Sequence, residues 1–405
     1  MLSNRFTLVC AVPAVVAVLA ACGGVPPAAG GTAAGGKVDK TNAAACENGV
    51  PGVQDGNINI GVNVTATGKS ALTGQYMKDS LDIALAELND AGGVKGKKLK
   101  LIYQDNQSTN PGAVSALTKS LSQDNVFTVI GPITSTQIQA MLPVLKSAHV
   151  PMMVGGTNKD LTDQGGGLLF RFRPSDELAA KAMVQWAVKS RGAKSIGLLH
   201  DSDAAGSGAA KIIEAAAKEA GVSLKSEAYT TGDKDFTGQL VNLRNSKPDV
   251  LIVNSTAPAD AAIISRQLKE LGLGMPVIGS PSYSSQATLS LSGAFGNGLY
   301  VMVDFLPGAN PKSKDFSKKF QAKTGSAPDL FSAWPYDALQ VVAATIDKVG
   351  CDRQAFMDAL RATKDYQGVQ GTLTSNAKGD LNANLLVVQI RNGKPELIDT
   401  VKVSS

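Results

Sequence analysis

The sequence predicts an α/β protein with two lobes, each built on a mostly parallel β-sheet. Short apolar runs rich in β-branched residues alternate with segments whose apolar residues recur every three to four positions. This alternation runs through residues 58–154 and begins again after the segment 171–174. Because repeated βα units place helices on both faces of a parallel sheet, the two sets predict two sheets.

The first set of expected elements follows from apolar runs and helix-start signals. The run Ile58–Val64 indicates a buried strand, and Leu81, Leu85 and Leu88 mark one face of the helix that follows it. Asn110 with Pro111 behind it is typical of a helix start. The expected strands are 58–64, 99–103, 126–130 and 150–154.

The second set repeats this rhythm and ends differently. Asn392-Gly393 between two β-branched runs is a strong hairpin signal and predicts two strands within residues 385–403. Asp352 is expected to cap a helix. The other expected strands are 195–200, 224–229, 250–253, 276–278 and 299–303, and the other expected helices are 207–220, one from 236, 259–271, 311–324 and 332–349.

The chain opens with an export signal. Arg5 precedes an apolar stretch over residues 8–19, and Leu19-Ala20-Ala21-Cys22 is a small-residue cleavage site ending in cysteine. This pattern resembles the bacterial lipoprotein signal, in which the cysteine becomes the lipidated first residue. Residues 1–21 are therefore expected to be a signal peptide, and Cys22 the point of lipid attachment to the membrane. The alternative is an ordinary secretory signal with an incidental cysteine, and either reading exports the protein.

Residues 22–55 are expected to be a flexible tether, because their Gly, Ala and Pro content leaves little to build a core from. No later apolar run reaches the roughly 18 residues that a membrane-spanning helix needs. The formal net charge of +5 is spread along the chain without a basic block, which argues against nucleic acid as a partner.

The cysteines predict one disulfide. Cys10 would leave with the signal and Cys22 would be acylated, so Cys46 and Cys351 remain in an oxidising compartment and are expected to pair. The alternative is two unpaired thiols, because sequence alone cannot place them side by side. Two cysteines and two isolated histidines lack the spacing of a zinc site, so neither a metal nor another cofactor is expected.

Two breaks in the first set predict a binding site. The expected strands 126–130 and 150–154 both end in loops that carry hydroxyls and glycines, and a helix begins directly after the first loop. Ligands of open α/β sheets bind at the carboxyl ends of strands, and hydroxyls, glycine amides and a helix N-terminus suit a carboxylate or another small anion. No nucleophile paired with a base is visible, so no catalysis is expected. The residues predicted to hold the anion are Ser135, Thr136, Gly155, Gly156 and Thr157.

Short motifs along the chain carry a family resemblance. They are Ala91-Gly92-Gly93-Val94-Lys95-Gly96, Gly131-Pro132-Ile133-Thr134-Ser135, Thr157-Asn158, His200-Asp201, Gly232-Asp233-Lys234-Asp235-Phe236 and Tyr336-Asp337-Ala338-Leu339-Gln340. In this order the chain resembles the type I periplasmic binding proteins, specifically the leucine/isoleucine/valine-binding branch of ABC-transporter solute receptors. The resemblance covers about Ile58 to Ile398.

The resemblance implies two Rossmann-like lobes joined by three crossing segments, near residues 174, 304 and 368. It places residues 56–174 and 305–368 in an N-terminal lobe and residues 175–304 and 369–405 in a C-terminal lobe. The lobes would close by a hinge motion over a small solute, because only the closed form contacts it from both sides. A membrane permease would then recognise the closed receptor.

Carried over residue by residue, Ser135, Thr157 and the backbone of Gly155 match positions that hold a ligand carboxylate in the family. Thr73, Ala205 and Thr256 stand where the family often has aromatic residues. The acidic group expected to meet a ligand ammonium near Pro281–Tyr283 is missing, and Asp201 is the candidate substitute. Tyr283 and Tyr336 complete the candidate ligand contacts. Ser108 and Thr134 occupy the positions of the family's usual disulfide.

The expected function is a non-enzymatic, lipid-anchored, extracytoplasmic receptor that delivers a small carboxylate-bearing, amino-acid-like or related solute to an ABC importer, acting as a monomer. The alternative is a lipoprotein that uses the same fold to sense a ligand and signal to a membrane partner. An exported hydrolase is the third reading, and no Ser/His/Asp set or carboxylate pair supports it.

Overall fold

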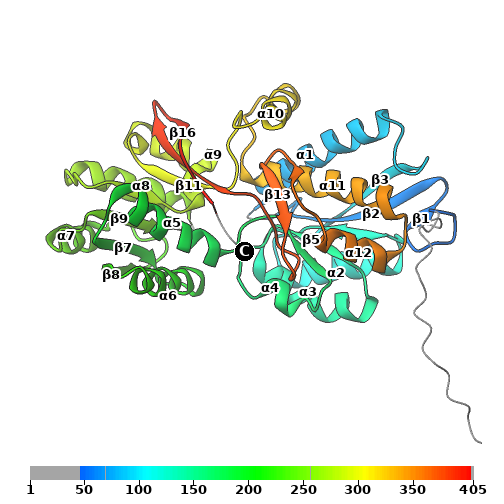
Figure 1. The fold of residues 1–405 in the computed structure, drawn as a ribbon, viewed down its shortest axis with the longest axis horizontal. Coiled ribbons are helices and arrows are strands. Elements are labelled where there is room, and N and C mark those ends of the chain that lie inside the picture. Colours follow the sequence, from blue (N-terminus) through cyan, green and yellow to red (C-terminus); the bar gives the residue numbers. More distant parts are fainter. Residues whose placement is uncertain (1–45, 69, 256, 403–405) are drawn as a thin grey trace, which may run out of the picture. The chain divides into compact units, whose positions relative to one another are not determined.

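The computed structural model describes residues 46–68, 70–255 and 257–402. The predicted signal peptide, Cys22 and most of the predicted tether lie outside these residues. The described residues form two large sheets and one small sheet, and Figure 1 shows helices packed along each large sheet. This is the mostly parallel α/β architecture that the sequence predicts.

The first sheet has the strand order β1-β2-β4-β5-β6, with β3 added beside β2. All of its pairs are parallel except the short antiparallel pair of β1 with β2. The strands are β1 (Val53–Gln54), β2 (Asn57–Val64), β3 (Lys98–Asp105), β4 (Thr128–Ile130), β5 (Met152–Val154) and β6 (Leu169–Arg171). The helices that follow them or pack on them are α1 (Ala71–Asp90), α2 (Asn110–Ser122), α3 (Ser135–Ala148), α4 (Leu161–Gln164), α10 (Pro311–Thr324), α11 (Leu330–Val349) and α12 (Arg353–Arg361).

The second sheet has the order β16-β15-β11-β10-β9-β7-β8. Its strands from β7 to β11 pair in parallel, and the predicted hairpin adds β15 and β16 as antiparallel strands. The strands are β7 (Ser195–Asp201), β8 (Ser223–Tyr229), β9 (Val250–Asn254), β10 (Val277–Gly279), β11 (Tyr300–Val303), β15 (Leu385–Arg391) and β16 (Lys394–Val401). The helices are α5 (Asp176–Arg191), α6 (Ala204–Glu219), α7 (Thr237–Asn245), α8 (Pro258–Glu270) and α9 (Gln286–Ser292), with 3-10 turns η1 (Pro281–Ser284) and η2 (Gly293–Gly296). The small sheet contains β12 (Tyr366–Gln367), β13 (Thr372–Ser375) and β14 (Leu381–Asn382).

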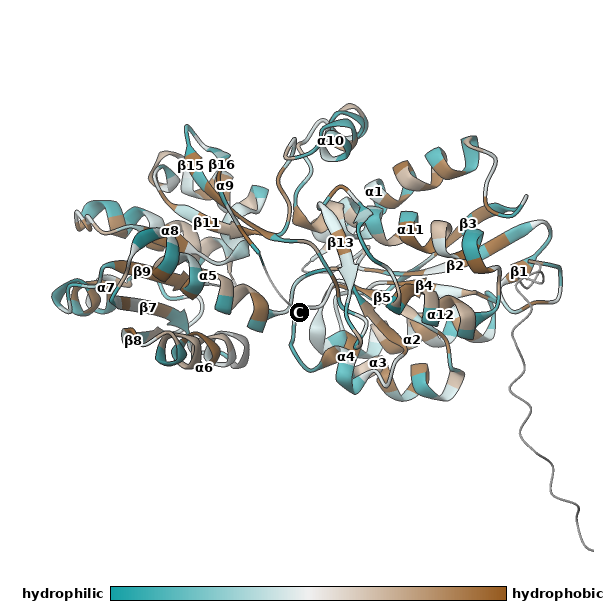
Figure 2. Ribbon diagram, viewed as in Figure 1, coloured by the Kyte–Doolittle hydropathy of each residue, from teal (hydrophilic) through white to brown (hydrophobic). Residues whose placement is uncertain are grey.

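Continuous burial explains why the central strands read as unbroken apolar runs. Every residue of β4, β5 and β9 is buried, as expected for strands covered on both faces. In Figure 2 the central strands are mostly brown, while the helices carry teal segments. Among the described residues, no helix has both the length and the apolar character that would let it cross a membrane.

Helix caps fix several of the predicted starts. The Asp352 side chain accepts from the Ala355 N–H (2.7 Å), which confirms it as the cap of α12. The cap of α2 lies one residue before the predicted Asn110: Thr109 Oγ1 accepts from the Gly112 N–H (3.0 Å). The Thr109 side chain supplies the capping oxygen, and Pro111 is tolerated as the second helical residue because a first-turn N–H has no partner within the helix.

Two stretches that are far apart in sequence share the first core. Buried apolar residues from Cys46 to Phe172 pack with others from Phe305 to Leu381, and residues from Ala179 to Val303 pack around the second sheet with those of the final hairpin. Near residue 304 the chain passes from the core around the second sheet, with Val303, to the first core, with Phe305. Val369, Leu373 and Leu381, which follow the expected crossing near residue 368, also pack in the first core.

The segments that pass from one core to the other are bonded to each other. Arg173 Nε donates to Asp304 Oδ2 (2.7 Å), and this ion pair is almost wholly buried. Gln370 Nε2 donates to the Phe172 carbonyl (3.1 Å). Both oxygens of the Asp337 carboxylate accept backbone N–H groups, from Val369 (2.8 Å) and Gln370 (2.9 Å). These contacts tie all of the predicted crossings to one another or to α11.

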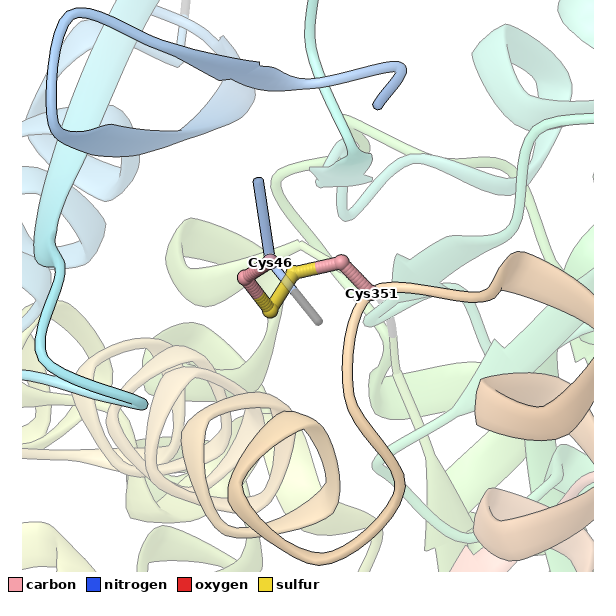
Figure 3. Close-up of a disulfide and its surroundings, with 2 residues drawn as sticks. All are labelled: Cys46 and Cys351. Carbon is pink, nitrogen blue, oxygen red and sulfur yellow. A yellow bond between two sulfur atoms is a disulfide. The ribbon is translucent and has the colours of Figure 1, made fainter. Parts of the chain in front are cut away.

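The predicted disulfide is present. Cys46 and Cys351 are joined with a Cα–Cα distance of 5.0 Å, and both side chains are buried (Figure 3). The bridge links the start of the described chain to the loop after α11. The predicted tether therefore reaches too far along the chain, because from Cys46 onward it is held by the disulfide and by the pairing of β1 with β2.

Candidate functional site

The loops after β4 and β5 meet, as the parallel pairing of these strands requires. Ile130 lies beside Met153 at the ends of the two strands. The Asn158 N–H donates to Ser135 Oγ (3.2 Å), and the Gly155 N–H donates to the Pro132 carbonyl (3.3 Å). The predicted anion-binding residues of both loops are therefore brought together in one place.

Ser135 keeps a free donor in this arrangement. It is the first residue of α3, and its hydroxyl oxygen accepts from Asn158 while its proton has no acceptor among the described residues. The N–H groups of Gly156 and Thr157 also donate to no described residue. The Gly155 N–H, which is predicted to hold the ligand, instead donates to the Pro132 carbonyl. Thr136 follows Ser135 in the first turn of α3 and is exposed.

Glycine is required in the second loop because side chains close in from two elements. A Cβ atom at Gly155 would lie 2.6 Å from Cε2 of Trp334. A Cβ atom at Gly156 would lie 2.4 Å from Cδ1 of Ile138 and 3.1 Å from Ser135 Oγ. The absence of side chains at both positions lets the loop backbone lie against α3 and α11.

Thr157 lies beside an acidic residue that sequence reasoning missed. Its carbonyl accepts from the Asp176 N–H (2.8 Å) at the start of α5. Burial raises the pKa of the Asp176 carboxyl, against a hydrogen bond from Thr157 and the nearby charges of Arg173 and Arg171. An acidic residue in the first helical turn after a serine cap is common in helices, so no sequence signal distinguishes Asp176 as a site residue.

Thr73 faces a small cavity of about 10 Å³ next to these loops. Thr73 comes from α1, Ile133 from the loop after β4, and Phe331 and Trp334 from the first turns of α11. The full lining is Asn63, Thr65, Thr73, Gly74, Met77, Ile133, Phe331 and Trp334. The cavity thus connects the predicted contact at Thr73 with the loop that precedes Ser135.

Tyr336 is not part of this group. Its hydroxyl donates to the Glu87 carboxylate, and it lines a separate cavity of about 380 Å³ with residues of α1, α10, α11 and β12. Burial, with the hydrogen bond to Glu87, raises its pKa well above the ordinary value. Residues 331 and 334 lie one turn apart on α11, while residue 336 projects from another face. The aromatic side chain of α11 that packs against Gly155 is therefore Trp334, with Phe331 on the same side of the helix.

Asp201 and Tyr283 come together at the second sheet. Asp201 ends β7 and is fully buried, and a Cβ atom at Gly206 would lie 1.5 Å from its Oδ1, so its carboxylate is under the first turn of α6. Tyr283, in η1, is also buried. Burial, together with the nearby charges of Tyr229, Asp260 and Asp201, raises the pKa of its hydroxyl well above the ordinary value. Ala205 belongs to the first turn of α6. Thr256 lies outside the described residues.

Comparison with known proteins gives a consistent family assignment. A family model described as periplasmic binding protein matches residues 57–395. Leu/Ile/Val-binding protein homolog 3 of Brucella melitensis is 29% identical over 330 residues, which cover 80% of this chain and 89% of that protein. The leucine-, isoleucine-, valine-, threonine- and alanine-binding protein of Pseudomonas aeruginosa is 26% identical over 328 residues, covering 80% of this chain and 87% of that protein.

Solved structures agree with this assignment. The substrate-binding protein LivJ of Streptococcus pneumoniae, in complex with isoleucine, superposes with a TM-score of 0.75 at 26% identity, covering 85% of this chain and 99% of that one. The leucine-binding protein LivK of Thermotoga maritima superposes with a TM-score of 0.74 at 25% identity, covering 85% and 98%. Proteins of this family are receptors without enzymatic activity. The chain belongs to the periplasmic binding protein family, in its type I, branched-chain amino acid branch.

Proposed function

We propose that this protein is an extracytoplasmic receptor, anchored through Cys22, that delivers a small carboxylate-bearing solute to the permease of an ABC importer. The observation that carries the proposal is the meeting of the loops after β4 and β5, where the Ser135 hydroxyl and the N–H groups of Gly156 and Thr157 donate to no described residue. Three donors without acceptors suit the oxygens of one carboxylate.

The start of α3 adds to this preference for an anion. Ser135 occupies its first position, and the first N–H groups of a helix point outward and carry a partial positive charge. A carboxylate that accepts from Ser135 therefore also lies near the favourable end of the helix dipole.

The relatives support an amino-acid-like solute. Two of them are named for leucine, isoleucine and valine, and the pneumococcal structure holds isoleucine. In this chain the segment Ser280–Tyr283 offers no acidic group for an ammonium, and the Asp201 carboxylate is buried against α6. Asp176 is an acidic group that lies beside Thr157. The proposed solute class therefore includes amino acids and related carboxylic acids.

The proposed lobes are residues 56–174 with 305–368, and residues 175–304 with 369–405, the short segment after 368 packing with the first core. Closure would bring the second lobe's Asp201 and Tyr283 region toward the Ser135 loop. The bonded crossing segments act as the hinge, and ligand binding shifts the population toward the closed form.

The test is direct. The mature protein is purified, ligand released by denaturation is identified by mass spectrometry, and thermal shift is measured with a panel of amino acids and short carboxylic acids. A ligand at 100 times its dissociation constant should stabilise the folded state by about 2.7 kcal/mol. Ser135→Ala should weaken binding of the identified ligand about tenfold or more, since it removes a hydrogen bond to a charged group.

Ser115→Ala is the matched control, because Ser115 is an exposed serine of α2 that is not among the predicted ligand contacts, so ligand affinity should not change. Unchanged affinity in Ser135→Ala would refute the carboxylate site. Failure of every carboxylate in the panel to bind would refute the proposed function as a whole. Uptake of the ligand by cells that lack this protein, compared with the parent, tests delivery to a permease.

A further inference from the structure

Trp334 carries an unused donor beside the proposed site. The side chain is fully buried, yet its Nε1 has no hydrogen-bond partner among the described residues. Buried donors in folded proteins are nearly always paired with a protein group, an ordered water or a ligand. An unpaired indole N–H at this position therefore points to an acceptor that comes from outside the chain.

The polar residues that line the cavity next to Trp334 do not accept a hydrogen bond from its Nε1. Asn63 lines the same space, but its Nδ2 donates to the Ala113 carbonyl (2.9 Å) and its Oδ1 accepts from Asn106 (3.0 Å). The Thr65 hydroxyl donates to Asn106 Oδ1 (2.9 Å). The polar side chains of Asn63 and Thr65 are therefore hydrogen-bonded to other groups, and none of these bonds involves Trp334 Nε1.

The cavity lies close to the proposed carboxylate position. The edge of the indole that carries Nε1 packs against Gly155, since a Cβ atom there would lie 2.9 Å from Nε1. Trp334 lines the cavity together with Ile133, from the loop after β4, and Thr73, from α1. Its volume of about 10 Å³ has room for a group the size of one water, such as a hydroxyl, and not for a branched aliphatic side chain.

We propose that Trp334 is a specificity-determining residue of this site: its ring limits the size of the ligand group that enters the cavity, and its N–H donates to an oxygen on that group. The preferred solute is then a short carboxylic acid with a hydroxyl or carbonyl oxygen near the carboxylate. This inference rests on the proposed function and narrows its substrate class.

Isosteric ligand pairs test the inference. Threonine and valine differ by a hydroxyl in place of a methyl group, and 3-hydroxybutyrate and isovalerate form the same pair without an ammonium. Calorimetry on the wild-type protein should favour the hydroxylated member of at least one pair by about tenfold, the value of one hydrogen bond to an otherwise unpaired buried donor. Trp334→Phe keeps an aromatic ring without the N–H and should abolish this preference.

The chain offers a matched control, because it contains two tryptophans and the other, Trp186, is equally buried in the second core. Trp186→Phe should lower stability by a similar amount and leave the preference between the paired ligands unchanged. It also leaves Trp334 as the single tryptophan. Its emission should then shift when the hydroxylated ligand binds and shift less with the methyl isostere.

The outcomes separate this inference from the proposed function. Equal affinity for both members of each pair in the wild-type protein, or a preference retained in Trp334→Phe, would overturn the role of the indole while the carboxylate site stands. If neither pair binds and no other carboxylate does, the proposed function itself fails. Should Trp334→Phe not fold, the fluorescence of Trp186→Phe with each ligand pair still decides the question.

Discussion

Gly155 and Trp334 are complementary in shape: a Cβ atom at position 155 would lie 2.6 Å from Cε2 of the indole ring. We therefore expect Gly155→Ala to destabilise the protein by about 1–3 kcal/mol, through displacement of the indole or of the loop after β5. Chemical denaturation measures the change. In combination with Trp334→Phe the loss should be smaller than the sum of the two single losses, because a smaller ring relieves the contact.

Gly238→Ala provides the control for this substitution. Gly238 lies on the exposed face of α7, and a Cβ atom there has no neighbour within 4 Å. Alanine is a better helix former than glycine, so stability should rise by about 1 kcal/mol. A loss in Gly238→Ala as large as that in Gly155→Ala would contradict the steric explanation.

The ion pair of Arg173 with Asp304 predicts a large effect at the crossing segments. The two side chains are 10% and 3% exposed, so removal of the carboxylate leaves a buried cation. We expect Asp304→Ala to destabilise the folded state by about 3–5 kcal/mol. The exposed pair Arg391–Glu396 is the comparison, and Glu396→Ala should cost less than about 1 kcal/mol. Urea titration of both variants checks the contrast, and equal effects would contradict it.

Removal of the disulfide should weaken the fold and spare the ligand site. Cys46→Ser with Cys351→Ser is expected to lower stability by about 2–5 kcal/mol, because the bridge spans a sequence separation of 305 residues. Cys351 follows the end of α11 that is opposite to Trp334, and a helix of 20 residues is about 30 Å long. Ligand affinity below the unfolding transition should therefore stay within about twofold. A large loss of affinity would show that the two ends of α11 are coupled.

The pH dependence of stability should reveal Asp337. Burial raises the pKa of its carboxyl from 3.8 to about 7, against the hydrogen bonds from Gln370 and Val369. Burial likewise raises the pKa of Asp329, to about 6. The folded protein then binds protons more tightly than the unfolded chain, so stability should rise as the pH falls from about 8 to about 5. Urea midpoints across this range measure the slope, which should flatten in Asp337→Asn; an unchanged slope would exclude Asp337 as its source.

The sequence could predict the parts of this fold that depend on regular patterns. The apolar run Ile58–Val64 predicts its strand, and Asn392-Gly393 predicts its hairpin turn, from a few neighbouring residues alone. The proximity of the loops that carry Ser135 and Asn158 could also be predicted, because the carboxyl ends of neighbouring parallel strands lie at one edge of a sheet.

Sequence patterns do not predict the position of Trp334 or the packing of the segment that follows residue 368. Helix α11 is buried around most of its circumference, so its apolar periodicity does not indicate which face meets Gly155. The sequence therefore predicts a ligand contact for Tyr336, whereas the residue that packs against the loop is Trp334. Strands β13 and β14 are too short to show an alternating pattern, which hides their membership of the first core. Asp176 resembles any acid at a helix start until Thr157 is seen beside it.

The disulfide also decides how mechanical load enters the fold. A pull on the chain before Cys46 reaches the described residues at Cys46, and the disulfide passes it directly to Cys351 at the junction of α11 and α12. Without the bridge, the same force would peel the two-residue strand β1 from β2. The bridge therefore protects the pairing of β1 with β2 from a force that two strand residues would otherwise carry alone.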